Sequence, residues 1–149
     1  MSTNISGLKS KIIDRISTEI TTIQECVDYE KTGFRGFPAV TVVCSGNEND
    51  YYTTAENQRT FTFIITVYEQ LEDVPLLDNV SDNAKERAEE IMERVVSEII
   101  DAFDEFYEFG SAADFCKAIP SAWGYAKTGH GWCRVAQIKL EVVQGYVVQ

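Results

Sequence analysis

The stretch RTFTFIITVYE (residues 59–69) alternates between apolar and mostly polar side chains, which is the two-residue period of a β-strand with one buried face. The side chains expected to face the core are Phe61, Phe63, Ile65 and Val67. The opposite face of the same strand carries Thr62, Thr66 and Tyr68. Because a strand with one apolar face needs a second layer to cover it, this stretch predicts a sheet packed against helices.

A shorter strand is predicted just upstream, in GFPAVTVVCSG (residues 36–46). Residues 47–58, between the two strands, are polar and show no periodicity, so we expect a long loop that closes a hairpin. A polar loop of this length in a compact chain is more often functional than filler. We therefore count Asp50, Tyr51 and Tyr52 as candidate assembly residues.

Two amphipathic helices are predicted, one before and one after this hairpin. The first covers residues 5–27, with isoleucines three or four residues apart and Ser6 as its N-cap. The second begins after Ser81, its N-cap, and ends at Gly110. Its apolar stripe is formed by Ala84, Ala88, Ile91, Val95, Ile99, Ala102, Phe103 and Phe106.

The last forty residues predict a second hairpin. Residues 115–127 form one strand, in which Pro120 and Gly124 indicate an edge position or a bulge. Residues 128–131 form the turn, and residues 132–143 return as the second strand, with alternating apolar side chains.

The expected fold is a single α+β domain over residues 1–149, with the order α-ββ-α-ββ. Its sheet would be four-stranded and mostly antiparallel, with both helices packed on one face. The opposite face would carry Thr41, Thr62, Thr66, Tyr68, Gln137 and Lys139. Such a face is polar enough for water and rich enough in β-branched and aromatic residues to meet a partner, so Thr62, Thr66 and Tyr68 join the candidate assembly residues.

Composition narrows the classes of function. The chain has 149 residues, 44% of them hydrophobic, which excludes a disordered protein. Its formal charge of −11 argues against binding to nucleic acid or to an anionic membrane surface. With no apolar run of membrane-spanning length and no secretory signal, we expect a cytosolic protein with reduced cysteines.

Side chains able to carry chemistry are few. The single histidine, His130, lies between two glycines in the predicted turn, where we expect an exposed side chain rather than an oriented catalytic base. Cys133, three residues later, is already on the strand. The four cysteines are far apart in sequence, so we expect buried thiols and neither a metal site nor a cofactor. We predict no catalytic residue and no enzyme.

An acidic face marks the end of the second helix, where Asp101, Asp104, Glu105 and Glu108 are spaced three or four residues apart. Acidic groups there oppose the helix dipole, because a helix C-terminus favours cations. A solvated face is one interpretation. Binding of a basic partner or of a hydrated cation is the other.

Four parts of the chain together resemble the small tail-terminator or tail-completion (neck) proteins of tailed bacteriophages. They are GFPAVTVVCSG, YYTTAENQRTFTFIITVYEQ (residues 51–70), the long acidic helix and IPSAWGYAKTGHGWCRVAQIKLEVV (residues 119–143). The resemblance covers most of the chain and the order of its elements. It implies a structural virion protein, without enzymatic activity or cofactor, that forms a ring on the head-proximal end of the tail tube. Head–tail connector (neck adaptor) proteins are similar in size and composition and are the alternative.

The partners implied by this resemblance are further copies of the chain in a ring, usually a hexamer, the tail tube protein and the neck proteins. DNA would pass through the ring without specific binding, and no membrane would be involved. In that setting the acidic helix end would face the lumen or a basic neck partner, since negative charge repels phosphate. A small-ligand-binding regulatory α+β domain is a further alternative, and it predicts a concave apolar pocket.

Overall fold

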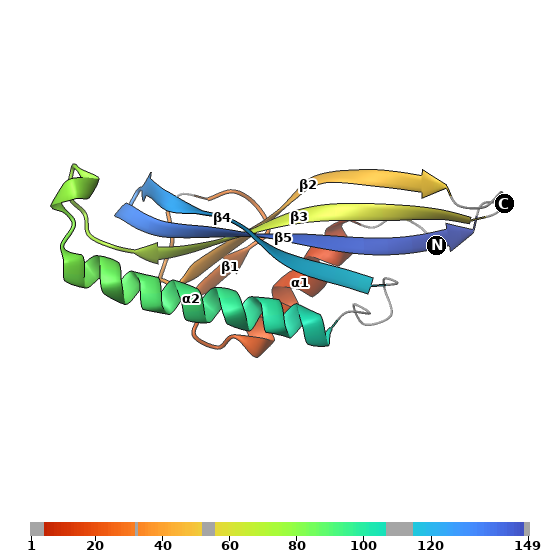
Figure 1. Cartoon of the computed structure of the whole chain (residues 1–149), viewed down its shortest axis with the longest axis horizontal. Coiled ribbons are helices and arrows are strands. Elements are labelled where there is room, and N and C mark those ends of the chain that lie inside the picture. The colour runs from red at the N-terminus through yellow and green to blue at the C-terminus, as the bar shows by residue number, and fades with distance from the viewer. Residues whose placement is uncertain (1–4, 32, 52–55, 107–114, 148–149) are drawn as a thin grey trace.

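The computed structural model describes residues 5–31, 33–51, 56–106 and 115–147. Its elements follow in the order α1 (Ile5–Glu19), β1 (Glu25–Val27), β2 (Ala39–Tyr51), β3 (Glu56–Gln70), the short 3-10 helix η1 (Leu77–Asn79), α2 (Asp82–Glu105), β4 (Phe115–Thr128) and β5 (Gly131–Val147). The fold is α+β, which confirms the class predicted from the sequence (Figure 1).

All five strands form one sheet in the order β1-β2-β3-β5-β4. The two hairpins, β2–β3 and β4–β5, join through an antiparallel pairing of β3 with β5. The expected four-stranded sheet was wrong in one respect, because β1 pairs with β2 in parallel and makes the sheet five-stranded and mixed. A strand of three residues is too short to show a period, so the sequence pattern did not indicate it.

The first helix is shorter than predicted. It ends at Glu19 rather than at residue 27, and Gln24 N–H already donates a 2.9 Å hydrogen bond to the Pro38 carbonyl beside the sheet. Ile20 and Ile23 keep the helical spacing although the chain has turned there, because both still pack against the core. Ser6 lies inside the helix, which begins at Ile5, and is therefore not its N-cap.

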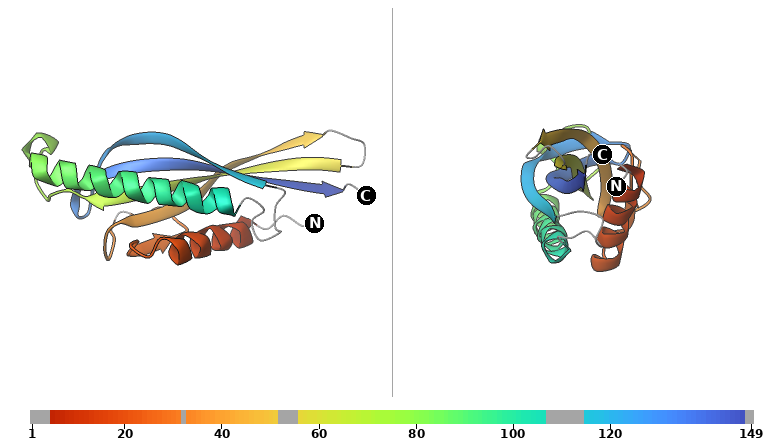
Figure 2. Two further views of the ribbon diagram at one scale, coloured as in Figure 1. Left: turned by 60° about the horizontal axis from the view of Figure 1, so that its bottom comes forward. Right: turned by 90° about the vertical axis from the view of Figure 1, so that its right-hand side faces the viewer.

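Both helices cover the same face of the sheet (Figure 2). Leu8, Ile12 and Ile16 of α1 are buried there. The sheet side chains beneath the helices include Phe61, Phe63, Ile65 and Val67, as the alternation predicted. The stripe of α2 is rotated slightly from the prediction, since Met92 is fully buried whereas Ile91 is only partly so.

The start of α2 confirms the predicted cap. Ser81 Oγ accepts a 3.2 Å hydrogen bond from the Ala84 N–H, and Ser81 N–H donates to Glu72 Oε1 at 2.6 Å. Two donors at the helix start are thereby satisfied. The described part of the helix ends at Glu105, and the predicted end at Gly110 lies outside the described residues.

Strands β2, β3 and β5 continue beyond the ends of both helices as a three-stranded arm (Figure 2). In this arm β2 pairs with β3 up to Tyr51 and Asn57, and β3 pairs with β5 up to Glu56 and Val147. The loop expected over residues 47–58 is therefore mostly strand, a correction to the prediction. The helices cover neither face of the arm, so its sequence has no apolar alternation, and backbone pairing defines these strands.

The second hairpin agrees with its prediction. Thr128 pairs with Gly131 across a two-residue turn, and the register shifts between Pro120 and Trp123. Gly131 has a φ of +93°, and a Cβ there would lie 2.5 Å from the Asp73 Cα. Glycine is therefore required by both conformation and space. Strand β4 is an edge strand, as Pro120 indicated.

Candidate functional site

The sheet face turned away from the helices is partly covered by the connection between β1 and β2. Of the three candidate assembly residues on this face, Thr62 is partly exposed, Thr66 is buried and Tyr68 is half-buried. The Tyr68 ring lies 4.9 Å from the Phe34 ring, measured between centroids. The open part of this face therefore lies farther toward the arm, where it includes Thr62.

His130 is held by this connection and is not the exposed turn histidine expected from the sequence. Its Nε2 accepts a 2.7 Å hydrogen bond from the backbone N–H of Phe34, and its ring meets the Phe37 ring edge-on at 5.5 Å. The His130 carbonyl also accepts a hydrogen bond from the Gln70 side chain at 3.0 Å. The glycine-flanked turn did not indicate this packing, because the contacts come from residues between 60 and 96 positions away in the sequence.

A buried carboxylate holds the same connection in place. Glu25 of β1 pairs with the Lys31 ammonium and accepts a 2.8 Å hydrogen bond from the Arg35 backbone N–H. The Arg35 guanidinium lies 3.8 Å from the other carboxylate oxygen. The Lys31 hydrogen bond, followed by that from Arg35, holds the pKa of Glu25 below its ordinary value of 4.5.

The cysteines lie in apolar surroundings. Burial raises the pKa of Cys26 to about 12 and that of Cys116 to about 11. Cys133 is also buried, with a raised pKa, and its Sγ lies 3.5 Å from Thr128 Oγ1. These thiols stay protonated at neutral pH, a form that is a poor nucleophile. Among the described residues, no group of three or more histidine, cysteine, aspartate or glutamate side chains is placed to hold a metal ion.

Three of the four acidic residues predicted at the end of α2 are exposed: Asp101, Asp104 and Glu105. Glu108 lies outside the described residues. The last turn of α2 has no basic residue of its own, and Arg15 of α1 supplies a cation there. Arg15 Nε donates a 3.1 Å hydrogen bond to the Ala102 carbonyl, and one of its terminal nitrogens lies 3.8 Å from Glu105. The conflict with the helix dipole is thus partly relieved within the chain.

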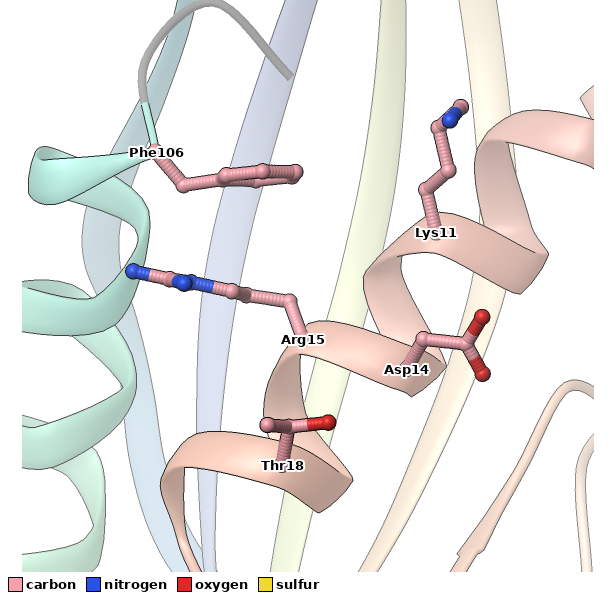
Figure 3. A pocket seen from close by; sticks show the side chains of 5 residues that line it. All are labelled: Lys11, Asp14, Arg15, Thr18 and Phe106. Carbon is pink, nitrogen blue, oxygen red and sulfur yellow. The ribbon is translucent and has the colours of Figure 1, made fainter. Parts of the chain in front are cut away.

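Arg15 also lines a hollow of about 260 Å³ between α1 and the end of α2 (Figure 3). The other lining residues are Lys11, Asp14, Thr18 and Phe106. The guanidinium lies 4.8 Å from the centroid of the Phe106 ring and also donates a 3.0 Å hydrogen bond to Glu19. This hollow is lined mainly by charged and polar side chains, unlike the apolar pocket that a small-ligand domain would need.

Strand β4 displays a surface that the sequence analysis did not single out. Phe115, Trp123 and Tyr125 are 44%, 39% and 41% exposed, and they are half of the six large apolar side chains exposed in the described ranges. The same strand carries Pro120 and the exposed Lys117 and Lys127, features that discourage further pairing at a sheet edge. The available signal was the concentration of aromatic residues in a strand already predicted to lie at an edge.

Arg134 of β5 fixes the two larger rings of this surface. Its guanidinium lies 5.2 Å from the Trp123 ring centroid and 4.8 Å from that of Tyr125. Two of its nitrogens donate to the carboxylate of Glu89 on α2, at 2.7 and 3.2 Å. A third nitrogen donates to the Gly124 carbonyl at 3.0 Å. The rings are therefore pre-positioned at the edge rather than free to rotate.

The candidate residues lie in three separate places. Asp50 and Tyr51 are at the far end of β2 in the arm, and Tyr52 lies outside the described residues. The acidic residues of α2 are on the helix side of the domain. Thr62, Thr66 and Tyr68 are on the opposite face of the sheet from those helices. No single concave site gathers these described residues.

Comparisons with known proteins add no further assignment. A scan against models of protein families found no match, and neither did a search of curated proteins. In the ranges that the structure describes, no helix combines the length and the apolar character needed to cross a membrane.

Proposed function

We propose that this chain is a structural protein of a tailed-bacteriophage virion, which forms a ring on the head-proximal end of the tail tube and joins the tube to the neck. The observation that carries the proposal is the long sheet. The sequence segments that resemble tail terminators coincide with β2, β3 and the β4–β5 hairpin, and these pair as one continuous sheet.

A ring of identical subunits needs two different, complementary surfaces on each copy. The sheet offers such a pair, because its two edges lie on opposite sides of the domain (Figure 1). One edge is β4, with its three exposed aromatic residues. At the other edge, the short strand β1 covers only Ala39 to Thr41 of β2, and the rest of β2 forms the edge. This geometry supports assembly through heterologous contacts.

The surroundings of the histidine and of three cysteines support a structural role rather than a catalytic one. His130 Nε2 accepts the Phe34 N–H, and burial keeps the thiols of Cys26, Cys116 and Cys133 protonated. These groups serve packing, which is what a structural subunit requires. The proposed protein therefore has no enzymatic activity and needs no cofactor.

In this proposal the partners are further copies of the chain, in a ring of six, together with the tail tube protein and neck proteins. Assembly takes place in the host cytoplasm and the product resides in the virion. The acidic end of α2 faces the lumen or a basic neck protein, so that DNA slides past without sticking. Each subunit contributes a formal charge of −11 to the negative electrostatic field of the ring.

The test is to co-express the chain with the tail tube subunit encoded in the same genome and to examine the product by native mass spectrometry and negative-stain electron microscopy. A ring of about six times 16.8 kDa at one end of each tube is the expected result. A ring that binds the head connector and ignores the tube would favour the neck adaptor instead. A monomer that is indifferent to both would contradict the proposal.

A further inference from the structure

We infer that two copies of the free chain form a twofold-symmetric dimer, in which β4 of each copy lies against the acidic side of α2 of the other. This inference goes beyond the proposed function, because it concerns the chain before it reaches a tube end. The dimer covers the aromatic edge of the sheet, which the proposed ring also uses, so the dimer separates before the ring forms.

The first surface is the edge strand β4, which is the last strand in the sheet order and pairs with β5 on one side only. Trp123 and Tyr125 are exposed there, and Arg134 holds both rings in place. The strand also contains Lys117 and Lys127, both exposed, and no acidic residue. The lysines discourage pairing with a further strand, whereas the ordered aromatic rings are typical anchors for the side chains of a partner.

The second surface is the side of α2 that faces β4. Glu89 marks this side, because its carboxylate binds Arg134, whose guanidinium contacts two rings of β4. Glu86 and Glu93 lie about one turn before and after Glu89, and Asp104 lies about three turns after Glu93, so these carboxylates share one side of the helix. Glu86, Glu93 and Asp104 are exposed.

The charges of the two surfaces are not neutralised within one copy. Among the ion pairs of the described residues, none involves Lys117, Lys127, Glu86 or Asp104. A basic, aromatic strand and an acidic helix therefore lie side by side on one flank of the domain (Figure 2). Such a flank is complementary to a second copy of itself when the strand of each copy meets the helix of the other.

The strand and the helix run antiparallel along this flank. Cys116, near the start of β4, has its Sγ 3.6 Å from the carbonyl oxygen of Phe103, near the end of α2. Farther along β4, the Gly124 carbonyl shares Arg134 with Glu89, in the first half of α2. The start of β4 is therefore level with the end of α2, and the end of β4 is level with the start of α2.

This arrangement places opposite charges at the same levels, because Lys117 is level with Asp104 and Lys127 with Glu86. The two lysines are about 30 Å apart along the strand, and α2 is about 36 Å long, so one helix can meet both. A twofold axis parallel to the strands leaves every residue at its own level. It therefore brings the two lysines of each copy to the two carboxylates of the other.

A twofold axis that runs across the strands is disfavoured by charge. It would set β4 against β4 and α2 against α2, which brings like charges together. The axis parallel to the strands instead forms each attractive contact twice, as in every isologous interface.

The experiment measures self-association of the purified full chain by sedimentation velocity over a concentration series at low salt, without tail tubes. The strand variant, Lys117→Glu/Lys127→Glu, reverses the charge of β4. The helix variant, Glu86→Lys/Asp104→Lys, reverses the charge of the facing side of α2. Circular dichroism establishes that each variant is folded.

Each variant has a matched control with the same change of charge. For the strand variant it is Lys9→Glu/Lys11→Glu on α1, which lies on the other side of the domain from β4 (Figure 2). For the helix variant it is Glu98→Lys/Asp101→Lys, on the other side of α2.

We expect the wild-type chain and both controls to form a dimer of about twice 16.8 kDa. The strand variant and the helix variant should each associate at least about tenfold more weakly, because like charges then meet. An equimolar mixture of these two variants should regain the dimer, since every contact in a mixed pair again joins opposite charges. Trp123→Ser should weaken association without changing the charge.

The inference is overturned if the wild-type chain stays monomeric at every concentration or forms an assembly larger than a dimer without tubes. It is also overturned if the strand and helix variants associate as well as wild type, or if their mixture associates no better than either alone. The proposed function is judged separately, by a ring at tube ends, so either proposal can fail while the other stands.

Discussion

The backbone N–H of Phe34 donates a 2.7 Å hydrogen bond to Nε2 of His130, which ties the connection between β1 and β2 to the turn between β4 and β5. The two residues come from opposite edges of the sheet in strand order. Because a backbone N–H can only donate, Nε2 is the acceptor in this contact. The contact closes the end of the domain opposite the arm.

Replacing this histidine should loosen that end of the domain. His130→Ala removes the acceptor of the Phe34 N–H and the edge contact with Phe37. We expect a loss of about 1–2 kcal/mol in the free energy of unfolding, measured by urea denaturation. Lys127→Ala, at an exposed position of the same hairpin, should change it by less than about 0.5 kcal/mol. Equal stability of the two variants would contradict a packing role for His130.

Glu25→Gln tests the buried ion pair beneath the same connection. The substitution removes the charge that Lys31 and Arg35 face, so we expect a loss of roughly 2 kcal/mol in the free energy of unfolding at pH 7. The reduced folded-state pKa of Glu25 sets the pH dependence. Its stabilising contribution is complete above the ordinary value of 4.5 and is lost as the pH falls toward the folded-state pKa.

The difference between wild type and Glu25→Gln should therefore shrink below about pH 4.5. Chemical denaturation at pH 7 and at pH 3.5 measures it directly. A difference that stays constant between these two pH values would show that the carboxylate charge makes no contribution there.

The sequence was informative wherever burial imposed a period. Phe61 to Val67 alternate because α1 and α2 cover one face of β3, and Ser81 indicated its helix start through a local hydrogen bond. The arm was missed because no helix covers it, and β1 because a strand of three residues cannot display a period. In both cases pairing with a distant strand decides the structure.

The candidate surfaces likewise divide into features that a local sequence signal indicates and features that only long-range contacts create. The edge position of β4 could be predicted from Pro120, which is a local property. The role of Arg134 between Glu89, Trp123 and Tyr125 could not be predicted, because it depends on three elements meeting in space. Long-range contacts of this kind have no signature in a single sequence.

Arg134 gives a further prediction, because its planar guanidinium makes two parallel hydrogen bonds to Glu89. Arg134→Lys should lower the free energy of unfolding by about 1–2 kcal/mol, since an ammonium cannot reproduce the paired bonds or the stacking on Tyr125. A double-mutant cycle with Glu89→Gln should give a coupling energy of about 1 kcal/mol. The exposed pair Arg94 and Glu98, 3.7 Å apart, is the control and should give less than about 0.5 kcal/mol.

The pH dependence of the stability contributed by Glu69 should be opposite in sign to that contributed by Glu25. Burial raises its pKa above the ordinary 4.5, although Arg87 and Arg94 partly offset the effect, and its Oε2 has no hydrogen-bond partner within the described residues. The folded state therefore favours the protonated carboxyl, and ionisation costs stability as the pH rises from 4.5 through the folded-state pKa. Glu69→Gln should raise the melting temperature at pH 7 and have little effect at pH 4. A lower melting temperature at pH 7 would refute this assignment.

The last prediction concerns the acidic end of α2. Asp101→Lys/Asp104→Lys reverses two exposed charges and leaves Glu105, which lies near Arg15, unchanged. Cations near a helix C-terminus are favourable, so the variant should be at least as stable as wild type. If this surface faces DNA or a basic neck protein, the variant should fail to restore plaque formation to a phage whose own copy of the gene is disrupted.

Glu86→Lys/Glu93→Lys makes the same charge change at exposed positions in the first half of the helix, away from its C-terminal end, and is the matched control. It should restore plaque formation, since the proposed contact lies only at the helix end. Because the helix-end variant gains stability from the helix dipole, its failure cannot be attributed to unfolding. Full infectivity of that variant would instead identify the acidic end of α2 as a solvated face, for which Arg15 already provides the cation that the helix end requires.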